Sequence, residues 1–365
     1  MKKPIAITLG DPAGIGAEII AKAYLLAPEL TKGCFVVGDV ATLRRAVQVV
    51  SAGKIPLPVA LIETPAEALN MPPRCLPVLQ VGAIAEPPAF GCLSASAGRL
   101  AAECVVWAAQ SCLRGDVAAM VTAPLNKEAL ALAGAPHSNY PGHTEMLQAL
   151  AAAHSGKSLS EMPVRMMLAN DELRVVLVSI HVSLREAIAA VTFDNVLQTL
   201  RITHDSLSAI LGHAPRIGVA GLNPHAGEGG LFGREEIDII APAIAAARLQ
   251  GLQVNGPFAP DTVFMRARSQ SDQLGEFDAV VAMYHDQGLI PVKYLGVEQG
   301  VNVTLGLPLV RTSPDHGTAF DIAGSAQADA SSLLAAIRMA RRLCRSASAD
   351  FDRSVTITNR PDPLS

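Results

Sequence analysis

Three histidines stand directly after apolar segments that resemble buried β-strands. The segment RVVLVSIH ends at His181, RIGVAGLNPH ends at His225, and DAVVAMYH ends at His285. In open α/β sheets, ligands bind in the crevice beyond the carboxyl ends of the strands. Imidazole is a common ligand of Zn²⁺ and similar ions, and three protein ligands leave coordination positions open for substrate. The placement predicts a divalent-metal site, although any one of these histidines could instead be a hydrogen-bonded structural residue.

Groups suited to an acidic or phosphorylated substrate occur elsewhere. The glycine-rich stretch GLNPHAGEGG (221–230) can present several backbone N–H groups to an anion. His143 and Thr144 stand at the start of a predicted helix, where Thr144 could also be a plain cap. Arg311 suits bidentate binding of phosphate or carboxylate and Lys293 supplies a point charge, with solvated surface charge as the alternative for each. The residues alone indicate a metal-assisted enzyme that acts on a small anion.

Short apolar runs alternate with longer alanine-rich segments of helical period. Predicted strands cover 5–9, 34–37, 117–121, 164–168, 174–180, 216–220, 279–283 and 301–305, and predicted helices cover 13–26, 95–113, 144–153, 195–211, 234–248 and 331–343. This alternation is typical of α/β proteins with a largely parallel sheet. The proline-rich stretch 51–91 is expected to be a variable surface excursion.

Composition excludes several classes of partner. Only 17% of the 365 residues are charged, the net charge is −4 and aromatic residues make up 4%. These values argue against binding to nucleic acid or to an anionic membrane. The six cysteines form no CxxC pair, so we expect reduced thiols. With no predicted signal peptide or membrane span, a soluble cytoplasmic protein is expected.

Six motifs together resemble the 4-hydroxythreonine-4-phosphate dehydrogenase family of pyridoxal phosphate biosynthesis. They are GDPAGIGAE, VTAPLNKEA, YPGHTE, GLNPHAGEGGLFG, AMYHDQG and GVNVTLGLPLVRTSPDHGTAFDIAG, in order over about residues 4–343. The resemblance implies oxidation of a secondary alcohol by NAD or NADP to a β-keto acid that loses CO₂. It also implies one divalent ion per site (zinc, magnesium or cobalt) and a homodimer with the active site at the subunit interface.

Site residues follow from the same resemblance. Its implied metal ligands are His181, His225 and His285, drawn from both subunits. Its implied substrate contacts are His143, Thr144, Lys293, Asn302 and Arg311. The general base is not assigned, and His143, Asp286 and Lys293 are the candidates.

The substrate is open between close relatives. The first expectation is 4-phosphohydroxy-L-threonine, whose product decarboxylates to 3-amino-2-oxopropyl phosphate. The alternative is 4-phospho-D-threonate or 4-phospho-D-erythronate, giving dihydroxyacetone phosphate, and the local wording APLNKEAL and NYPGHTEML is closer to this branch. From a different class, a metal-dependent hydrolase could use the same three histidines to activate water. A binding protein with a vestigial site is a third hypothesis.

The loop TLGDPAGIGAE, residues 8–18, resembles a phosphate loop, but its glycines follow the spacing GxxxGxG rather than GxGxxG. It is similar instead to the GDGIGPE start of isopropylmalate and isocitrate dehydrogenases, which bind NAD through a C-terminal segment. The counterpart here is HGTAFDIAG (316–324), so the resemblance places cofactor contacts at His316, Gly317 and Asp321.

The expected fold is therefore α/β with two αβα domains and a cleft between them, like isocitrate and isopropylmalate dehydrogenases rather than a Rossmann fold. The first domain is predicted to combine residues 1–130 and 306–346. The second is predicted to cover 131–305 and to carry most metal and substrate residues, with a loose tail over 347–365.

Overall fold

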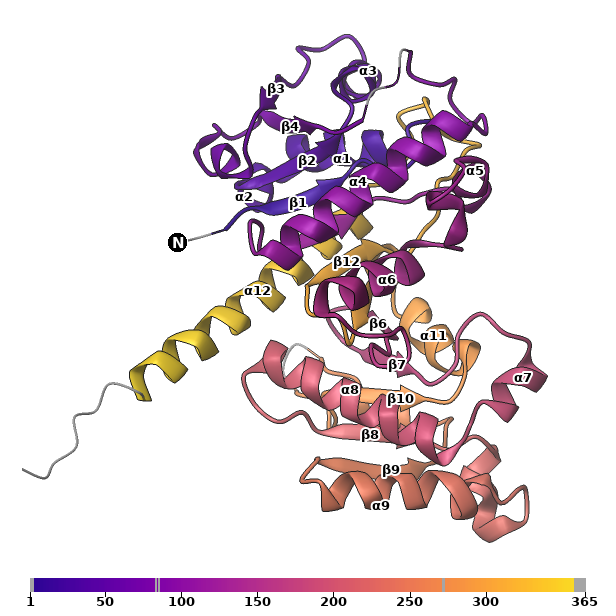
Figure 1. The fold of residues 1–365 in the computed structure, drawn as a ribbon. Coiled ribbons are helices and arrows are strands. Elements are labelled where there is room, and N and C mark those ends of the chain that lie inside the picture. Colours follow the sequence, from indigo (N-terminus) through magenta and orange to yellow (C-terminus); the bar gives the residue numbers. More distant parts are fainter. Residues whose placement is uncertain (1–2, 83, 85, 271–272, 358–365) are drawn as a thin grey trace, which may run out of the picture. The chain divides into compact units, whose positions relative to one another are not determined.

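The chain divides into two compact units. The structure, a computed structural model, describes residues 3–82, 84, 86–270 and 273–357 (Figure 1). Unit 1 consists of the described residues up to Val164 together with Val297–Ala340. Unit 2 consists of Arg165–Gly296 together with the described residues from Arg341 onward.

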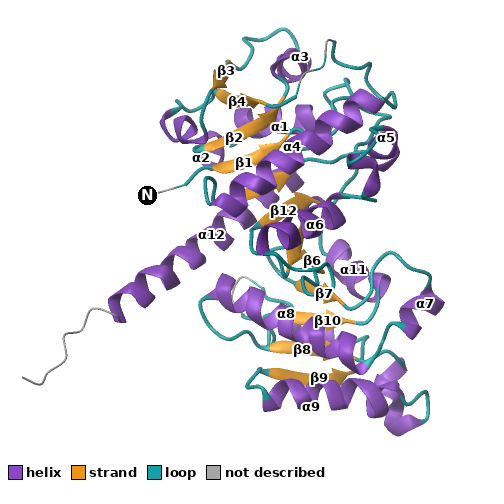
Figure 2. Ribbon diagram, in the orientation of Figure 1, coloured by secondary structure: helices purple, strands orange, loops and turns teal. Residues whose placement is uncertain are grey.

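Unit 1 is built on strands in the order β3-β4-β2-β1-β5-β12-β11. Figure 2 labels β3, β4, β2, β1 and β12 of this series. The strands of unit 1 are β1 (Ile5–Thr8), β2 (Cys34–Gly38), β3 (Val59–Ile62), β4 (Leu76–Gln80), β5 (Ala119–Thr122), β11 (Val301–Leu305) and β12 (Arg311–Pro314). All neighbouring pairs are parallel except β11 with β12. The inner strands β1, β2 and β5 are buried along their whole length, which explains why they appear in the sequence as continuous apolar runs.

The helices of unit 1 include short pieces that the sequence pattern did not indicate. They are α1 (Gly16–Leu26), α2 (Pro28–Thr31), α3 (Val40–Ser51), α4 (Ala95–Arg114), α5 (Lys127–Leu132), α6 (His143–Ser155) and the first part of α12 (Ser331–Ile357), whose residues from Arg341 on belong to unit 2, with 3₁₀ turns at Pro65–Asn70, His137–Asn139 and Val297–Gln299. Side-chain caps begin α3 and α5, where Asp39 accepts from the N–H of Thr42 and Asn126 accepts from that of Ala129.

Two features of this sheet bear on the sequence predictions. The order β3-β4-β2-β1-β5 differs from the 3-2-1-4-5-6 order of the dinucleotide-binding fold, which agrees with the expectation of a non-Rossmann α/β protein. The stretch 51–91, predicted to be a variable surface excursion, contains the strands β3 and β4, and β4 pairs with both β2 and β3. These strands were not predicted because the stretch is rich in proline. Pro77 stands inside β4, and a proline normally argues against a paired strand.

The strands of unit 2 follow one another in the order β6-β7-β10-β8-β9. Its strands are β6 (Arg165–Ala169), β7 (Arg174–Leu177), β8 (Ile217–Ala220), β9 (Val254–Phe258) and β10 (Ala279–Ala282). Its helices are α7 (Leu184–Ala189), α8 (Phe193–Leu211), a π-helix over Glu236–Ile240, α9 (Ala241–Leu249), α10 (Val263–Ala267) and α11 (His285–Tyr294), with a 3₁₀ turn over Pro224–Gly230. Only β6 and β7 are antiparallel; the other neighbours run parallel.

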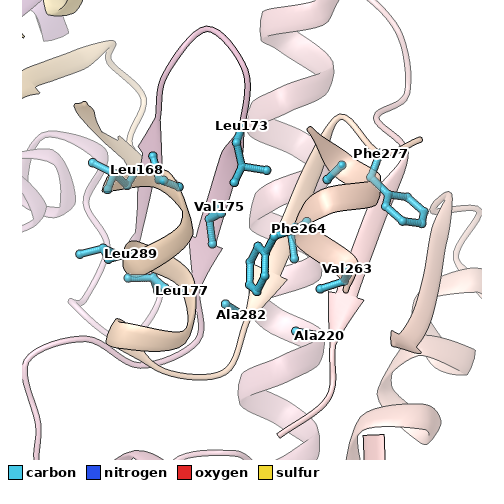
Figure 3. Close-up of a cluster of buried hydrophobic side chains, with 13 residues drawn as sticks. Leu168, Leu173, Val175, Leu177, Ala220, Val263, Phe264, Phe277, Ala282 and Leu289 are labelled. Carbon is cyan, nitrogen blue, oxygen red and sulfur yellow. The ribbon is translucent and has the colours of Figure 1, made fainter. Parts of the chain in front are cut away.

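The core of unit 2 lies between this sheet and the helices α10 and α11 (Figure 3). Val175 and Leu177 of β7 pack in one cluster with Phe264 of α10 and Leu289 of α11. Each of these side chains is at most 9% exposed. This packing fixes the carboxyl ends of β7 and β10, the positions from which two of the three histidines extend.

The unit boundaries and the chain end differ from the sequence-based ones. Residues 131–164 and 297–305, expected in the second domain, lie in unit 1, because α6 packs on α4 and β11 pairs with β12. The helix α12 continues to Ile357, so the part of the expected loose tail up to that residue is helical, and 358–365 lie outside the described residues. None of the helices in the described part of the chain combines the length and apolar character that a membrane span requires.

Candidate active site

The three histidines follow three neighbouring parallel strands of unit 2. The strands β7 and β8 flank β10 on its two sides, and both pairings are parallel. His181 comes after β7, His225 after β8, and His285 directly after β10 as the first residue of α11. Because parallel strands end at the same edge of a sheet, the topology delivers all three imidazoles to that edge.

Two of the imidazoles lie close together and one is held by a carboxylate. The ring centroids of His181 and His285 are 5.8 Å apart. His285 Nδ1 donates to Asp286 Oδ1 at 2.7 Å, so the lone pair of His285 lies on Nε2. A carboxylate on the far nitrogen is the arrangement that orients a metal-binding histidine and increases its basicity. The donor set therefore fits a divalent ion.

His225 stands on an unusual turn beyond β8. Residues His225–Gly229 all have positive φ, with values of 52°, 52°, 81°, 43° and 66°. Three of the five, His225, Ala226 and Glu228, carry side chains that disfavour this left-handed region. The imidazole is 64% exposed, and its ring centroid is 6.2 Å from that of Phe232. Among the described residues of one chain, no three His, Cys, Asp or Glu side chains are grouped closely enough to hold a metal ion.

A buried carboxylate holds this left-handed turn in place. Glu236, 2% exposed in the π-helix, accepts the backbone N–H groups of Leu222 and Asn223 on Oε1, each at 2.7 Å. Its Oε2 accepts the side-chain amide of Asn223 at 3.0 Å. The backbone of Gly227 lies so close that a Cβ there would be 2.7 Å from Glu236 Oε2. Sequence reasoning missed Glu236, because its partners lie 13 and 14 residues away.

A second residue missed by sequence reasoning joins two of the strand ends. Gln287, in the first turn of α11, accepts the N–H of Met283 at 2.7 Å. Its side-chain amide donates to the carbonyl of Gly221, just beyond β8, at 2.7 Å. Gln287 thus links the segment that carries His285 to the segment that carries His225.

The predicted substrate residues are divided between the units. Lys293 is half-buried in the last turn of α11 in unit 2. His143 and Thr144 open α6, while Asn302 lies in β11 and Arg311 begins β12, all in unit 1. Asn302 stands opposite Ser313 in the antiparallel pair.

Arg311 is a buried cation held by hydroxyl groups. It is 4% exposed, and its guanidinium donates to Thr122 Oγ1 at 2.8 and 3.1 Å and to Thr304 Oγ1 at 3.2 Å. Burial lowers its pKa to about 10, while the charge of Glu145 acts in the opposite direction. A desolvated cation of this kind is suited to an anionic ligand.

His143 lies in the electrostatic field of this cation. Burial lowers the pKa of His143 well below its usual value, and the positive charges of Arg311 and Lys127 lower it further. The imidazole is therefore neutral at physiological pH. Its Nε2 is buried and has no hydrogen-bond partner within the described structure, so this atom is open to a ligand.

The predicted cofactor residues follow β12 directly. The ring Nδ1 of His316 lies 3.0 Å from the carbonyl of Gly317, while its Nε2 is buried with no partner in the described part of the chain. Gly317 and Asp321 are exposed. The segment thus presents an unpaired ring nitrogen and an open carboxylate on unit 1.

The glycine loop Gly10–Gly16 uses its own backbone donors. The N–H of Asp11 donates to Pro124 O, that of Ala13 to Asp11 Oδ1, and that of Gly14 to Asp11 O. The N–H of Ile15 donates to Thr318 O at 3.0 Å. A phosphate loop needs such N–H groups free to face its anion, so this loop is a structural turn.

Comparison with known proteins identifies the family of the chain. The model of the family described as pyridoxal phosphate biosynthetic protein PdxA matches residues 31–340. A 4-hydroxythreonine-4-phosphate dehydrogenase of Beijerinckia indica is 51% identical over 93% of this chain and 95% of its own. A D-threonate 4-phosphate dehydrogenase of Salmonella typhimurium is 46% identical, covering 93% and 99%.

Solved structures lead to the same family. The crystal structure of a 4-hydroxythreonine-4-phosphate dehydrogenase from Klebsiella pneumoniae is 42% identical, with a TM-score of 0.82 over 94% of this chain and 98% of that one. This degree of similarity, together with the match of the family model, confirms the resemblance drawn from the motifs. The chain therefore belongs to the PdxA family and is a dehydrogenase.

Proposed function

We propose that this dehydrogenase oxidises 4-phosphohydroxy-L-threonine with NAD, NADP being the alternative cofactor. The secondary hydroxyl gives up its proton and its carbon passes a hydride to NAD, which becomes NADH. The resulting β-keto acid loses CO₂ and takes up a proton, leaving 3-amino-2-oxopropyl phosphate. This reaction would supply a step of pyridoxal phosphate biosynthesis.

The observation that carries the proposal is the delivery of three histidines to one sheet edge in a chain of a dehydrogenase family. We assign the metal to His181, His225 and His285, with Asp286 orienting His285. When bound, the divalent ion would supply Lewis-acid polarisation of the substrate oxygens and NAD would supply the hydride acceptor.

The chain's remaining residues bind and orient the substrate. Arg311 and Lys293 neutralise its phosphate and carboxylate, while Asn302 and Thr144 hold its polar groups. His143, neutral because its pKa is lowered, offers a buried ring nitrogen to a substrate donor. The general base is one of His143, Asp286 and Lys293. His143 as base would place the acidic limb of the rate profile well below the usual histidine range.

The metal site is completed in a homodimer. Of the three histidines, His181 and His285 form a close ring pair, and the described residues of one chain contain no group of three potential ligands. Exposed apolar side chains stand beside the histidines: Val182 and Leu184 follow His181, and Leu231 follows the turn of His225. Apolar side chains gathered beside functional residues are typical of an interaction surface. A second copy of the chain that covers these exposed side chains would supply the third metal ligand.

The second candidate is a D-threonate 4-phosphate dehydrogenase. It is favoured by the Salmonella typhimurium relative, which carries that name at 46% identity over 99% of its length. The relative named for 4-hydroxythreonine phosphate is more similar, at 51%. The two substrates differ mainly in an amine against a hydroxyl, so the same anion-binding residues would serve both.

A substrate panel tests the proposal. NADH formation and CO₂ release are measured with 4-phosphohydroxy-L-threonine, 4-phospho-D-threonate and 4-phospho-D-erythronate, each with zinc, magnesium or cobalt. The highest kcat/KM is expected for the first compound. A higher value for D-threonate phosphate would select the second candidate. Phosphate release without NAD would instead indicate a hydrolase.

A further inference from the structure

Helix α1, which follows the glycine loop, is tied to the backbone around the C-terminal end of the proposed cofactor segment 316–324. Glu18 is fully buried, and its carboxylate accepts the N–H of Gly324 at 2.5 Å and that of Ala326 at 2.9 Å. Lys22, one turn further along α1, donates to the carbonyls of Ala326 and Ala328 at 2.6 Å each. Both oxygens of one carboxylate and one ammonium group therefore bind the same stretch of backbone.

The backbone held in this way is strained. Ala326 has a φ of 58° and Ala319, within the segment, a φ of 41°, whereas the φ of 81° at Gly324 is one that glycine adopts freely. An alanine in the left-handed region persists only where surrounding contacts enforce it. The two N–H groups that Glu18 accepts lie on either side of Ser325. A buried carboxylate that loses such donors is costly, so this interaction is well suited to fix the turn.

The glycine loop contacts the other end of the same segment. The N–H of Ile15 donates to Thr318 O, and a Cβ on Gly14 would lie 2.9 Å from that same oxygen. The carbonyl of Ala13 accepts the N–H of Gly91, whose own Cβ position would be 2.7 Å from Phe320 O. The stretch from Ala13 to Lys22 thus borders the segment along its length.

We infer that Glu18 and Lys22 are positioning residues that shape segment 316–324 for the nicotinamide cofactor. The GDPAGIGAE motif acts on NAD through this segment and does not touch the phosphates itself. The inference rests on the proposed function, because the cofactor role of 316–324 belongs to that proposal. It gives a role to GDPAGIGAE, a motif that contributes no residue to the proposed metal and substrate sites.

The test measures NAD affinity in Glu18→Gln. The dissociation constant for NAD is measured by calorimetry without substrate, and kcat and both KM values are measured with substrate and metal. The glutamine can accept only one of the two N–H groups, so the Kd and KM for NAD should rise about tenfold. The KM for the phosphorylated substrate should change less than about twofold.

Two further comparisons separate positioning from a general loss of structure. Glu67→Gln controls for the same change elsewhere in unit 1, because Glu67 accepts the backbone N–H groups of Thr64 and Glu63 on Oε1 at the surface, far along the chain from the segment. It should leave the NAD affinity unchanged. Lys22→Met should weaken NAD binding, and Lys22→Arg, which keeps a donor, should restore most of it. The Lys22 pair also decides the matter if Glu18→Gln fails to fold.

The possible outcomes distinguish a failure of this inference from a failure of the proposed function on which it rests. If Asp321→Ala loses NAD affinity while the Glu18 and Lys22 variants bind as the wild type does, the inference is overturned and the cofactor segment stands. If neither Asp321→Ala nor Glu18→Gln changes the NAD affinity, the segment itself is wrongly assigned. A parallel loss of NAD affinity, substrate affinity and Tm would mean that Glu18 serves folding alone.

Discussion

Arg311 shows how a single residue can be prepared for an anion. Its charge is almost completely buried, and the hydroxyls of Thr122 and Thr304 orient the guanidinium without neutralising it. Arg311→Lys keeps a positive charge but loses the planar fork, so the KM for the phosphorylated substrate should rise more than about tenfold. Steady-state kinetics and the Tm check this together. An unchanged KM in a folded variant would remove Arg311 from the substrate site.

Asp11 makes a residue-scale prediction about pH. Burial raises its pKa from 3.8 to about 6, and its Oδ2 has no hydrogen-bond partner within the described structure. The folded state therefore holds this proton more tightly than the unfolded state, so the contribution to stability is full below pH 4 and is lost as the pH rises toward 6. Asp11→Asn, which imitates the protonated acid, should gain up to about 3 kcal/mol relative to the wild type between pH 4 and pH 7.

Denaturant unfolding at a series of pH values measures this difference. The control is Asp116→Asn, since that carboxylate lies at the surface in an ion pair with Arg114. A difference between wild type and Asp11→Asn that stays constant with pH would show that Asp11 titrates normally.

At the scale of elements, the turn after β8 depends on the helix that follows it. Each non-glycine residue in the left-handed region costs about 1–3 kcal/mol, and Glu236 binds the backbone at the start of this turn. Glu236→Gln can keep both backbone N–H groups on Oε1, but it removes the charge and places an amide N–H against the side-chain amide of Asn223, so His225 should lose its fixed position. The affinity for cobalt or zinc should fall about tenfold to a hundredfold.

Metal affinity is measured by calorimetry without substrate, beside the Tm. Glu161→Gln is the control, because Glu161 also accepts a backbone N–H but does so at the surface of unit 1. If Glu236→Gln binds metal as the wild type does, the turn holds His225 without this carboxylate.

The burial of an element decides whether it can be predicted from the sequence. Strands such as β1 and β10 are buried on both faces, so a continuous apolar run in the sequence predicts them. The strand β12, with the sequence RTSP, is equally buried but polar, so no apolar run indicates it. The helix α11 contains Pro291, which normally ends a helical pattern. Polar residues and prolines therefore prevented the prediction of elements that are buried like the others.

The residues of the candidate site could be predicted only where their signal is local in the sequence. Histidines after apolar runs could be found because strand ends are local features of a sequence. The carboxylates that fix the backbone could not, because Glu18 binds residues 306 and 308 positions away and Glu236 binds across a turn. No short spacing motif encodes such contacts. Only the fold brings these partners together.

At the scale of the whole molecule, the proposed homodimer makes a prediction that one chain cannot. If His181 and His285 come from one subunit and His225 from the other, His181→Ala and His225→Ala should each be inactive alone. In a mixed dimer one site combines both mutations and the other has none. Subunits that exchange at random should therefore recover about a quarter of wild-type activity. Mixing His181→Ala with His285→Ala is the control and should recover nothing, because those two ligands come from the same chain. Activity regained in the control, or absent from the first mixture when exchange is verified, would contradict this division of the ligands.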